Sequence, residues 1–201
     1  MKVLVGCEFS GIVRDAFIAH GHDAMSCDIL PTEKPGPHYQ GDVMDILDDG
    51  WDLMIAHPPC TFLCRNGANH QTTEEYKQMI ADGKKLFMGM LNAPIERICV
   101  ENPVPRKMAQ LPPYTQIIQP YHYGHDHSKK TCLWLKNLPE LQPTKMVDIT
   151  YITTANGHRY TAGWYKTPRN SKDRSRTFQG IADAMADQWG SGTTNQMAMD
   201  I

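Results

Sequence analysis

The chain has 201 residues, of which 41% are hydrophobic, so it can form one domain with a substantial core without disulfides or metal. Its formal net charge of −2 excludes a protein that attracts nucleic acid through overall positive charge, and any such contact requires a local basic patch. No apolar run has the length of a membrane span and no signal peptide is visible. We therefore expect a cytoplasmic protein whose six cysteines are reduced thiols.

The first half of the chain alternates apolar strands with helical segments, which predicts a Rossmann-like α/β fold with a mostly parallel sheet. Four buried strands are expected, at residues 2–5, 23–27, 53–56 and 98–100. The first two strands flank a helix over residues 12–19 that ends at His20 and Gly21. The prolines that follow the last two strands, at Pro58 and Pro103, are expected to end them. Residues 31–37 read as a proline-rich loop, followed by a short helical turn after Asp42.

The remaining elements are a helix, an antiparallel strand pair and a closing helix. Residues 72–75 (Thr-Thr-Glu-Glu) resemble a capping box. The helix behind it has an apolar stripe of Tyr76, Ile80, Phe87, Met88 and Leu91. Residues 115–119 and 131–135 predict an antiparallel edge pair, residues 146–175 a loop with one hairpin, and residues 179–189 the last helix. Residues 1–190 are thus expected to form a single domain with a flexible tail over residues 191–201.

Polar residues follow the strands at the edge of the sheet where ligands bind in open parallel sheets. They are Glu8, Ser10 and Gly11 after the first strand, Asp28 after the second and Asp42 near the third. Asp28 stands where a nucleoside cofactor needs an acid for its ribose hydroxyls, although an aspartate that only stabilises a turn is the alternative. The loop over residues 6–11 lacks the full glycine pattern of a dinucleotide site, which favours a cofactor without phosphate.

Cys60 is the candidate nucleophile. The two prolines before it fix the backbone and hold it in a rigid loop after a strand. A thiolate is suited to addition at an electron-poor carbon such as position 6 of a pyrimidine. Two alternatives are a structural cysteine in a proline turn and a zinc site. The candidate zinc ligands are His57, Cys60, Cys64 and His70, whose spacing matches no recognised zinc motif, so no metal is expected.

Glu101 is the candidate acid. A carboxyl group near a bound cytosine can bind and protonate the ring nitrogen beside the amino group, which makes position 6 more electrophilic. Burial would raise the pKa of this carboxyl group. The alternative is a carboxylate that caps a nearby helix.

Three ordered motifs resemble those of the DNA cytosine carbon-5 methyltransferases. They are Gly-Asp-Val at residues 41–43, Pro-Pro-Cys at 58–60 and Glu-Asn-Pro at 101–103. The loop over residues 6–11 resembles the family's Phe-x-Gly-x-Gly-Gly loop with only the last glycine kept. Residues 123–135 resemble the segment that ends in the Gln-x-Arg-x-Arg motif, and residues 176–180 resemble the closing motif. The chain also resembles short methyltransferase-like proteins common in phage genomes.

The resemblance implies a class I S-adenosylmethionine-dependent methyltransferase fold, with Cys60 as the nucleophile and Glu101 as the acid that activates the base. Lys129 stands at the first arginine of the Gln-x-Arg-x-Arg motif and would contact the base carbonyl or a phosphate, while His127 and Thr131 replace two other residues of the motif. The implied cofactor is S-adenosylmethionine, with Asp28 expected on its ribose and Asp42 on its adenine amino group. The other implied cofactor-binding residues are Gly6, Cys7, Glu8, Phe9, Ser10, Gly11 and Pro58.

A long target-recognition domain normally precedes the closing motif in this family, and only residues 138–173 stand in its place here. This stretch and the residues after it are rich in basic and aromatic residues: Arg159, Tyr160, Trp164, Tyr165, Lys166, Arg169, Lys172, Arg174 and Arg176. The composition fits a reduced nucleic-acid grip, because aromatic rings stack on bases and cations contact phosphates, and it also fits a solvated loop.

Three functions stay open from the sequence. The first is methylation of cytosine carbon 5 in DNA, single-stranded or read with little sequence specificity. The second is the same carbon-5 chemistry on a free cytosine nucleotide, which the weak net charge and the short recognition region favour. The third is a non-catalytic module that uses a methyltransferase-like fold to bind nucleic acid.

Overall fold

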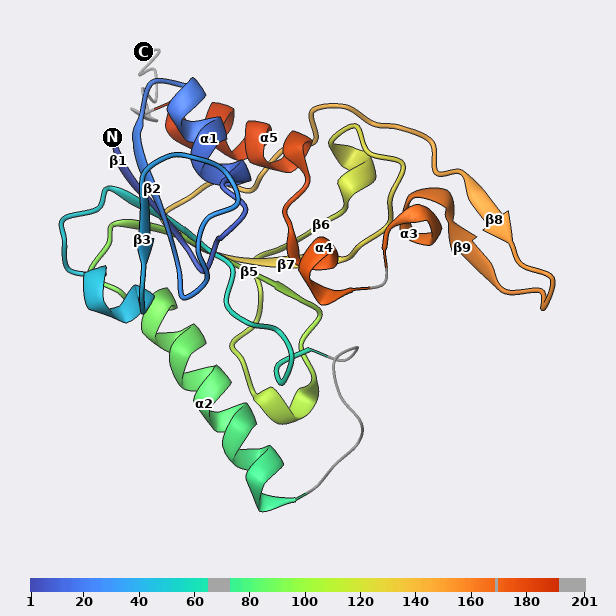
Figure 1. Ribbon diagram of the computed structural model, residues 1–201, viewed down its shortest axis with the longest axis horizontal. Coiled ribbons are helices and arrows are strands. Elements are labelled where there is room, and N and C mark those ends of the chain that lie inside the picture. Colours follow the sequence, from blue (N-terminus) through green and yellow to red (C-terminus); the bar gives the residue numbers. More distant parts are fainter. Residues whose placement is uncertain (65–72, 169, 192–201) are drawn as a thin grey trace, which may run out of the picture.

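The computed structural model describes residues 1–64, 73–168 and 170–191, and it is built on a seven-stranded sheet (Figure 1). Five parallel strands are β1 (Lys2–Gly6), β2 (Asp23–Asp28), β3 (His38–Gln40), β4 (Leu53–Ala56) and β5 (Arg97–Pro103). The edge pair is β6 (Gln116–Ile118) and β7 (Thr131–Lys136). The strand order is β3-β2-β1-β4-β5-β7-β6, with β7 antiparallel to both neighbours. This is a Rossmann-like fold with a mostly parallel sheet and an antiparallel edge pair, as predicted.

Helices cover both faces of the sheet, because side chains along each strand alternate between two cores. Val3 and Val5 of β1 point toward α1 (Ile12–Ala19) and α5 (Gln179–Gly190), which pack on one another. Leu4 of β1 lies in the opposite core, with α2 (Glu74–Leu91) and the short 3₁₀ helix at Val43–Ile46. β1 and β4 are therefore apolar along nearly their whole length, which made them predictable from sequence.

β5 is longer than the sequence indicates. The prediction that the strand ends before Glu101 is wrong, since β5 continues to Pro103. Every residue from Ile98 to Pro103 has a partner on β7, and the proline, which has no N–H to donate, is the last residue of the strand. Glu101 is therefore held within a paired strand. β3 was also missed, because it has only three residues, which directly follow the predicted proline-rich loop and pair with β2.

α2 begins one residue later than the capping-box pattern requires. Thr73 is the N-cap and its Oγ1 accepts a hydrogen bond from the Tyr76 N–H at 3.3 Å. The third helical residue is thus Tyr76 and not a glutamate, so the predicted box does not form; Thr72 lies outside the described residues. Tyr76, Ile80 and Phe87 are buried as predicted, together with Met90.

The region between the sheet and α5 contains the predicted hairpin, β8 (Tyr151–Thr153) paired with β9 (Arg159–Thr161). It extends away from the sheet in Figure 1. Two short helices, α3 (Ala162–Lys166) and α4 (Ser171–Ser175), were not predicted, because five residues are too few to form a recognisable apolar stripe. The predicted flexible tail lies almost wholly outside the described residues. No helix in the described ranges is long and apolar enough to cross a membrane.

Arg14 of α1 is completely buried and fastens the loop between β2 and β3 to this helix. Its charge is offset by Asp15, whose Oδ1 accepts from Nε at 2.8 Å. The guanidinium also donates to three oxygens of the loop, all at 3.3 Å: Thr32 Oγ1 and the carbonyls of Lys34 and Pro35. Because this loop starts directly after Asp28, Arg14 fixes the path of the chain at the edge of the sheet.

We expect Arg14→Ala to lower the free energy of unfolding by about 3 kcal/mol, because it removes a fully buried side chain together with the hydrogen bonds that it donates to the loop. Urea unfolding followed by circular dichroism measures this loss. Lys34→Ala is the control, since the Lys34 ammonium is half-exposed and lies 4.0 Å from Asp15, and its urea midpoint should not change. Equal midpoints for the two variants would contradict the structural role of Arg14.

Candidate functional site

The candidate site lies at the carboxyl ends of β1, β2, β4 and β5, where the strand order reverses between β1 and β4. His57 is the first residue after β4, and its N–H donates to the Gly6 carbonyl of β1 at 2.9 Å. β7 is antiparallel, so its first residue, Thr131, pairs with Pro103 at the end of β5. The segment with Lys129 therefore reaches the same edge of the sheet.

Glu101 is held by His57 through a nearly buried pair. His57 Nδ1 lies 3.0 Å from Glu101 Oε2, and the two side chains are only 12% and 13% exposed. Burial alone would lower the pKa of His57, but the hydrogen bond and charge of Glu101, with the charge of Glu8, raise it. Burial alone would raise the pKa of Glu101, but the hydrogen bond and charge of His57, with the charge of Lys129, lower it. The net shift of the Glu101 pKa is therefore downward, opposite to the rise expected from burial.

Cys60 is a partly buried thiol in a tight turn. The Cys64 N–H donates to the Cys60 carbonyl at 2.9 Å, and a hydrogen bond between the two thiols, followed by burial, raises the pKa of Cys60 well above its usual range. The positive charge of Lys129 acts in the opposite direction. Asn102 fastens this turn to β5, because its Nδ2 donates to the Pro58 carbonyl at 3.1 Å. Cys60 is thus a protonated thiol at neutral pH.

Lys129 connects these groups. Its charge acts on the thiol of Cys60, on the carboxyl group of Glu101 and on the imidazole of His57. Its Nζ donates to the Arg174 carbonyl at 2.9 Å, which links the site to α4. The structure therefore brings together the three residues that the sequence predicted as catalytic.

Glu8 has a structural role in the loop after β1. Its carboxylate accepts hydrogen bonds from the Val13 N–H at 2.7 Å, the Arg14 N–H at 3.3 Å and the Ser10 hydroxyl at 3.0 Å. The carboxylate thus occupies the N-terminus of α1, where dinucleotide-binding proteins hold a phosphate. This arrangement excludes a phosphate from that position and agrees with the prediction of a cofactor without one.

Asp28 and Asp42 each stabilise a turn with one oxygen. Asp28 Oδ1 accepts from the Leu30 N–H at 2.9 Å, and Asp42 Oδ1 accepts from the Met44 N–H at 3.0 Å. The turn alternative for Asp28 is thus present, while no residue in the described ranges donates to the second oxygen of either carboxylate. Burial and then the charges of Asp28 and Asp42 raise the pKa of Cys7 to about 12, so both acids lie near the same point of the edge.

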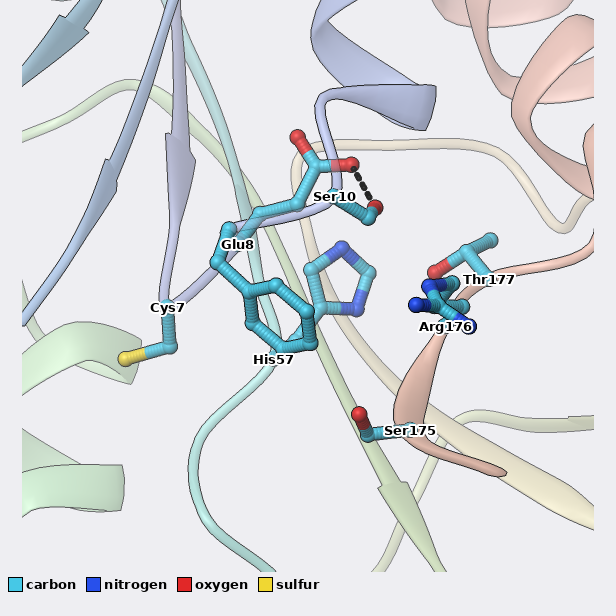
Figure 2. Close-up of a pocket in the computed structure, with 8 residues that line it drawn as sticks. Cys7, Glu8, Ser10, His57, Ser175, Arg176 and Thr177 are labelled. Atoms are coloured by element: carbon cyan, nitrogen blue, oxygen red, sulfur yellow. Dashed lines mark hydrogen bonds between the residues drawn. The ribbon is translucent and has the colours of Figure 1, made fainter. Parts of the chain in front are cut away.

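A small cavity of about 50 Å³ lies beside these residues. In Figure 2 the His57 imidazole is placed between the loop after β1 and the segment before α5. The lining residues are Cys7, Glu8, Phe9, Ser10, His57, Ser175, Arg176 and Thr177. Residues 175–177 thus meet the loop after β1 across this cavity. The volume suits a few water-sized groups and is far below that of a pocket that encloses a whole ligand.

His57 is the site residue that sequence reasoning missed, since it considered this histidine only as a zinc ligand. His70 of that zinc alternative lies outside the described residues, and the described ones contain no group of three or more side chains placed to hold a metal. The available sequence signal was the position of His57, directly after a buried strand at the switch point. Its partner could not be predicted, because Glu101 lies 44 residues further along the chain.

No protein-family model and no curated protein matches the sequence. Among solved structures, the chain is similar to a protein described as a DNA modification methyltransferase encoded within a prophage (E. coli), with 14% identity and a TM-score of 0.47 over 75% of this chain and 53% of that one. It is similar to the Entamoeba histolytica methyltransferase EhMeth, with 12% identity and a TM-score of 0.46 over 73% and 57%. It is also similar to a Spodoptera frugiperda DNMT2 mutant, with 14% identity and a TM-score of 0.38 over 73% of this chain and 54% of that one. The chain spans little more than half the length of these structures.

We expect Cys64→Ala to lower the pKa of Cys60, because it removes the thiol–thiol hydrogen bond that raises it. The thiolate fraction at neutral pH grows about tenfold for each pKa unit lost, while thiolate nucleophilicity falls less steeply, so alkylation should be at least about threefold faster. Iodoacetamide labelling of Cys60, followed by mass spectrometry of its peptide from pH 7 to pH 10, measures the rate. Cys64→Ser, whose hydroxyl can replace the hydrogen bond, should resemble the wild type. Equal rates for Cys64→Ala and wild type would contradict this explanation.

Proposed function

We propose that this chain is an S-adenosylmethionine-dependent methyltransferase that methylates carbon 5 of cytosine in DNA through a covalent Cys60 adduct. The observation that carries the proposal is the gathering of Cys60, Glu101 and Lys129 at the carboxyl edge of a methyltransferase-type sheet. A thiol, a carboxyl group and a cation in one place are the groups needed to attack, activate and orient a pyrimidine ring.

The residues along this edge fit S-adenosylmethionine. Asp28 has a free carboxylate oxygen for ribose hydroxyls, and the next two side chains, Ile29 and Leu30, are 75% and 46% exposed, so apolar surface is available for a purine ring. Glu8 blocks the phosphate position of a dinucleotide but leaves room for a cofactor without phosphate. The cavity beside His57 has the size of the polar end of an amino acid. When bound, this cofactor supplies an electrophilic methyl group.

Each side chain of the candidate site has a separate role in the reaction at the cytosine ring. Cys60 gives its proton to water and its sulfur adds to carbon 6, while Glu101 holds the ring nitrogen and its protonated partner His57 supplies the proton that this nitrogen takes up. Carbon 5 becomes nucleophilic and accepts the methyl group, after which a base removes its proton and the Cys60 sulfur is eliminated. Lys129 stabilises the thiolate and orients the base carbonyl or a phosphate. A base within a duplex would have to be flipped out.

The hairpin region favours DNA over a free nucleotide. The rings of Tyr160 and Trp164 stack at 4.7 Å, and the guanidinium of Arg174 lies over Trp164 at 4.8 Å. Tyr165 is 46% exposed and its ring centroid lies 6.2 Å from that of Tyr160. Tyr151 of β8 is 47% exposed, and the guanidinium of Arg159 lies over its ring at 3.8 Å. A preformed surface of exposed rings and cations suits single-stranded nucleic acid. We propose that residues 1–190 form one catalytic domain in which residues 138–173 serve as this reduced grip.

A single-stranded DNA that contains 5-fluorocytosine should form a covalent complex with the wild type in the presence of S-adenosylmethionine, because fluorine at carbon 5 prevents the elimination that frees the enzyme. Denaturing electrophoresis and intact-protein mass spectrometry detect the complex. Cys60→Ser should form none, whereas Cys99→Ser, which changes a buried thiol of β5, should form it normally. A complex with 5-fluorodeoxycytidine monophosphate and not with DNA would favour the nucleotide alternative. Absence of a complex with both would refute the proposed chemistry.

Replacing both exposed tyrosines of the hairpin region, Tyr151→Ala with Tyr165→Ala, should weaken binding of single-stranded DNA by about tenfold or more, because each stacked base contributes roughly 1–3 kcal/mol. Fluorescence anisotropy with a labelled oligonucleotide measures the affinity. Tyr114→Ala is the matched control. Tyr114 is 40% exposed, but its ring packs against Trp134 of β7 and does not belong to the hairpin region. Unchanged affinity in the double variant would contradict the grip.

A further inference from the structure

His57 has one ring nitrogen in use and one without a partner. Nδ1 is engaged by Glu101, whereas Nε2 is buried and has no hydrogen-bond partner in the described part of the chain. Buried polar atoms are normally paired, so an unpaired one beside a cavity indicates a ligand. The side chain of His57 lines the cavity between the loop after β1 and residues 175–177 (Figure 2).

The cavity can offer donors more readily than acceptors. The carboxylate of Glu8 is occupied by two backbone N–H groups and the Ser10 hydroxyl. The guanidinium of Arg176 is occupied by Glu33 and Asp173, although its positive charge remains nearby. Thr177 contributes a hydroxyl group to the lining, whereas the hydroxyl of Ser175, which also lines the cavity, donates to the Lys172 carbonyl at 2.8 Å. A histidine nitrogen and the Thr177 hydroxyl around a small volume suit a carboxylate.

We propose that His57 is a positioning residue that binds the carboxylate of the cofactor's amino-acid end through Nε2 while it holds Glu101 through Nδ1. This inference rests on the proposed function and extends it, because it makes one side chain touch both the cofactor and the acid that activates the base. A histidine that donates from both nitrogens is an imidazolium. Cofactor binding and the charge of Glu101 are then coupled through a single proton on His57.

The charged groups around His57 support this protonation state. Glu101 on β5 and Glu8 in the loop after β1 favour the imidazolium, while burial and Lys129 before β7 oppose it. Arg176 also lines the cavity, with its guanidinium paired to Glu33 and Asp173. The two acids outweigh the opposing effects, and the pKa of His57 lies above its ordinary value. A carboxylate at Nε2 would add a third negative group and raise the pKa further. Affinity for such a ligand should be complete below this pKa and should fall as the pH rises through it.

The test compares two ligands that differ only in the carboxylate, S-adenosylhomocysteine and its decarboxylated analogue, by isothermal titration calorimetry. The wild type should prefer S-adenosylhomocysteine by about tenfold or more, as a charge-assisted hydrogen bond to a buried partner provides. This preference should decline as the pH rises, whereas the affinity for the analogue should not follow the same profile.

Two substitutions separate the nitrogens of His57. In His57→Asn the amide nitrogen can replace Nδ1 and still donate to Glu101, but nothing reaches the cavity, so the preference for the carboxylate should fall to about onefold. In His57→Gln the amide nitrogen can replace Nε2, so part of the preference should return, while the contact with Glu101 is lost. The 5-fluorocytosine adduct should therefore form faster with His57→Asn than with His57→Gln.

An unchanged preference for S-adenosylhomocysteine in His57→Asn would overturn the inference and leave the proposed function intact, since the 5-fluorocytosine adduct tests that separately. A wild type that binds both ligands equally would overturn it as well. A third outcome is that both variants lose affinity for both ligands equally while their unfolding midpoints equal that of the wild type. His57 would then only shape the pocket, and the role of Nε2 would be overturned as well.

Discussion

The site depends on one buried interaction, the hydrogen bond between His57 Nδ1 and Glu101 Oε2. It joins the first residue after β4 to the last half of β5, and so it connects the two strands on one side of the switch point. Burying either charged group alone would cost free energy, because each side chain is nearly shielded from water. Paired with one another, the carboxylate and the imidazolium can both stay charged. Glu101 is therefore fixed in position and ionised rather than protonated by its surroundings.

The same edge separates two kinds of carboxylate. The carboxylate of Glu8 accepts hydrogen bonds from the N-terminus of α1 and has a structural role. Asp28 and Asp42 stabilise turns with one oxygen and keep the other available. Arg14, buried beneath this loop, links the helix that Glu8 caps to the loop that follows Asp28. The positions of the proposed ligand-binding residues thus follow from packing and hydrogen bonds below the surface of the candidate site.

Much of the fold was predictable, because parallel strands that are buried on both faces are apolar along their whole length. α1 and α5 were equally clear from their apolar stripes and their ends. The extension of β5 to Pro103 was not, because it depends on pairing with β7, about thirty residues further on. Cys60, Glu101 and Lys129 could be chosen from motif order. The contacts of Glu101 with His57 and of Cys60 with Cys64 depend on folded geometry. The contact with His57 makes the shift of the Glu101 pKa opposite to the one expected from sequence.

A crystal structure of the complex with S-adenosylhomocysteine tests this account most directly. We expect the ribose at Asp28, the carboxylate against His57 Nε2, and the sulfur facing the thiol of Cys60 across a space that fits a single base. A ligand bound elsewhere on the sheet, or a Cys60 thiol turned away from the cofactor with side chains filling the gap to Glu101, would contradict it.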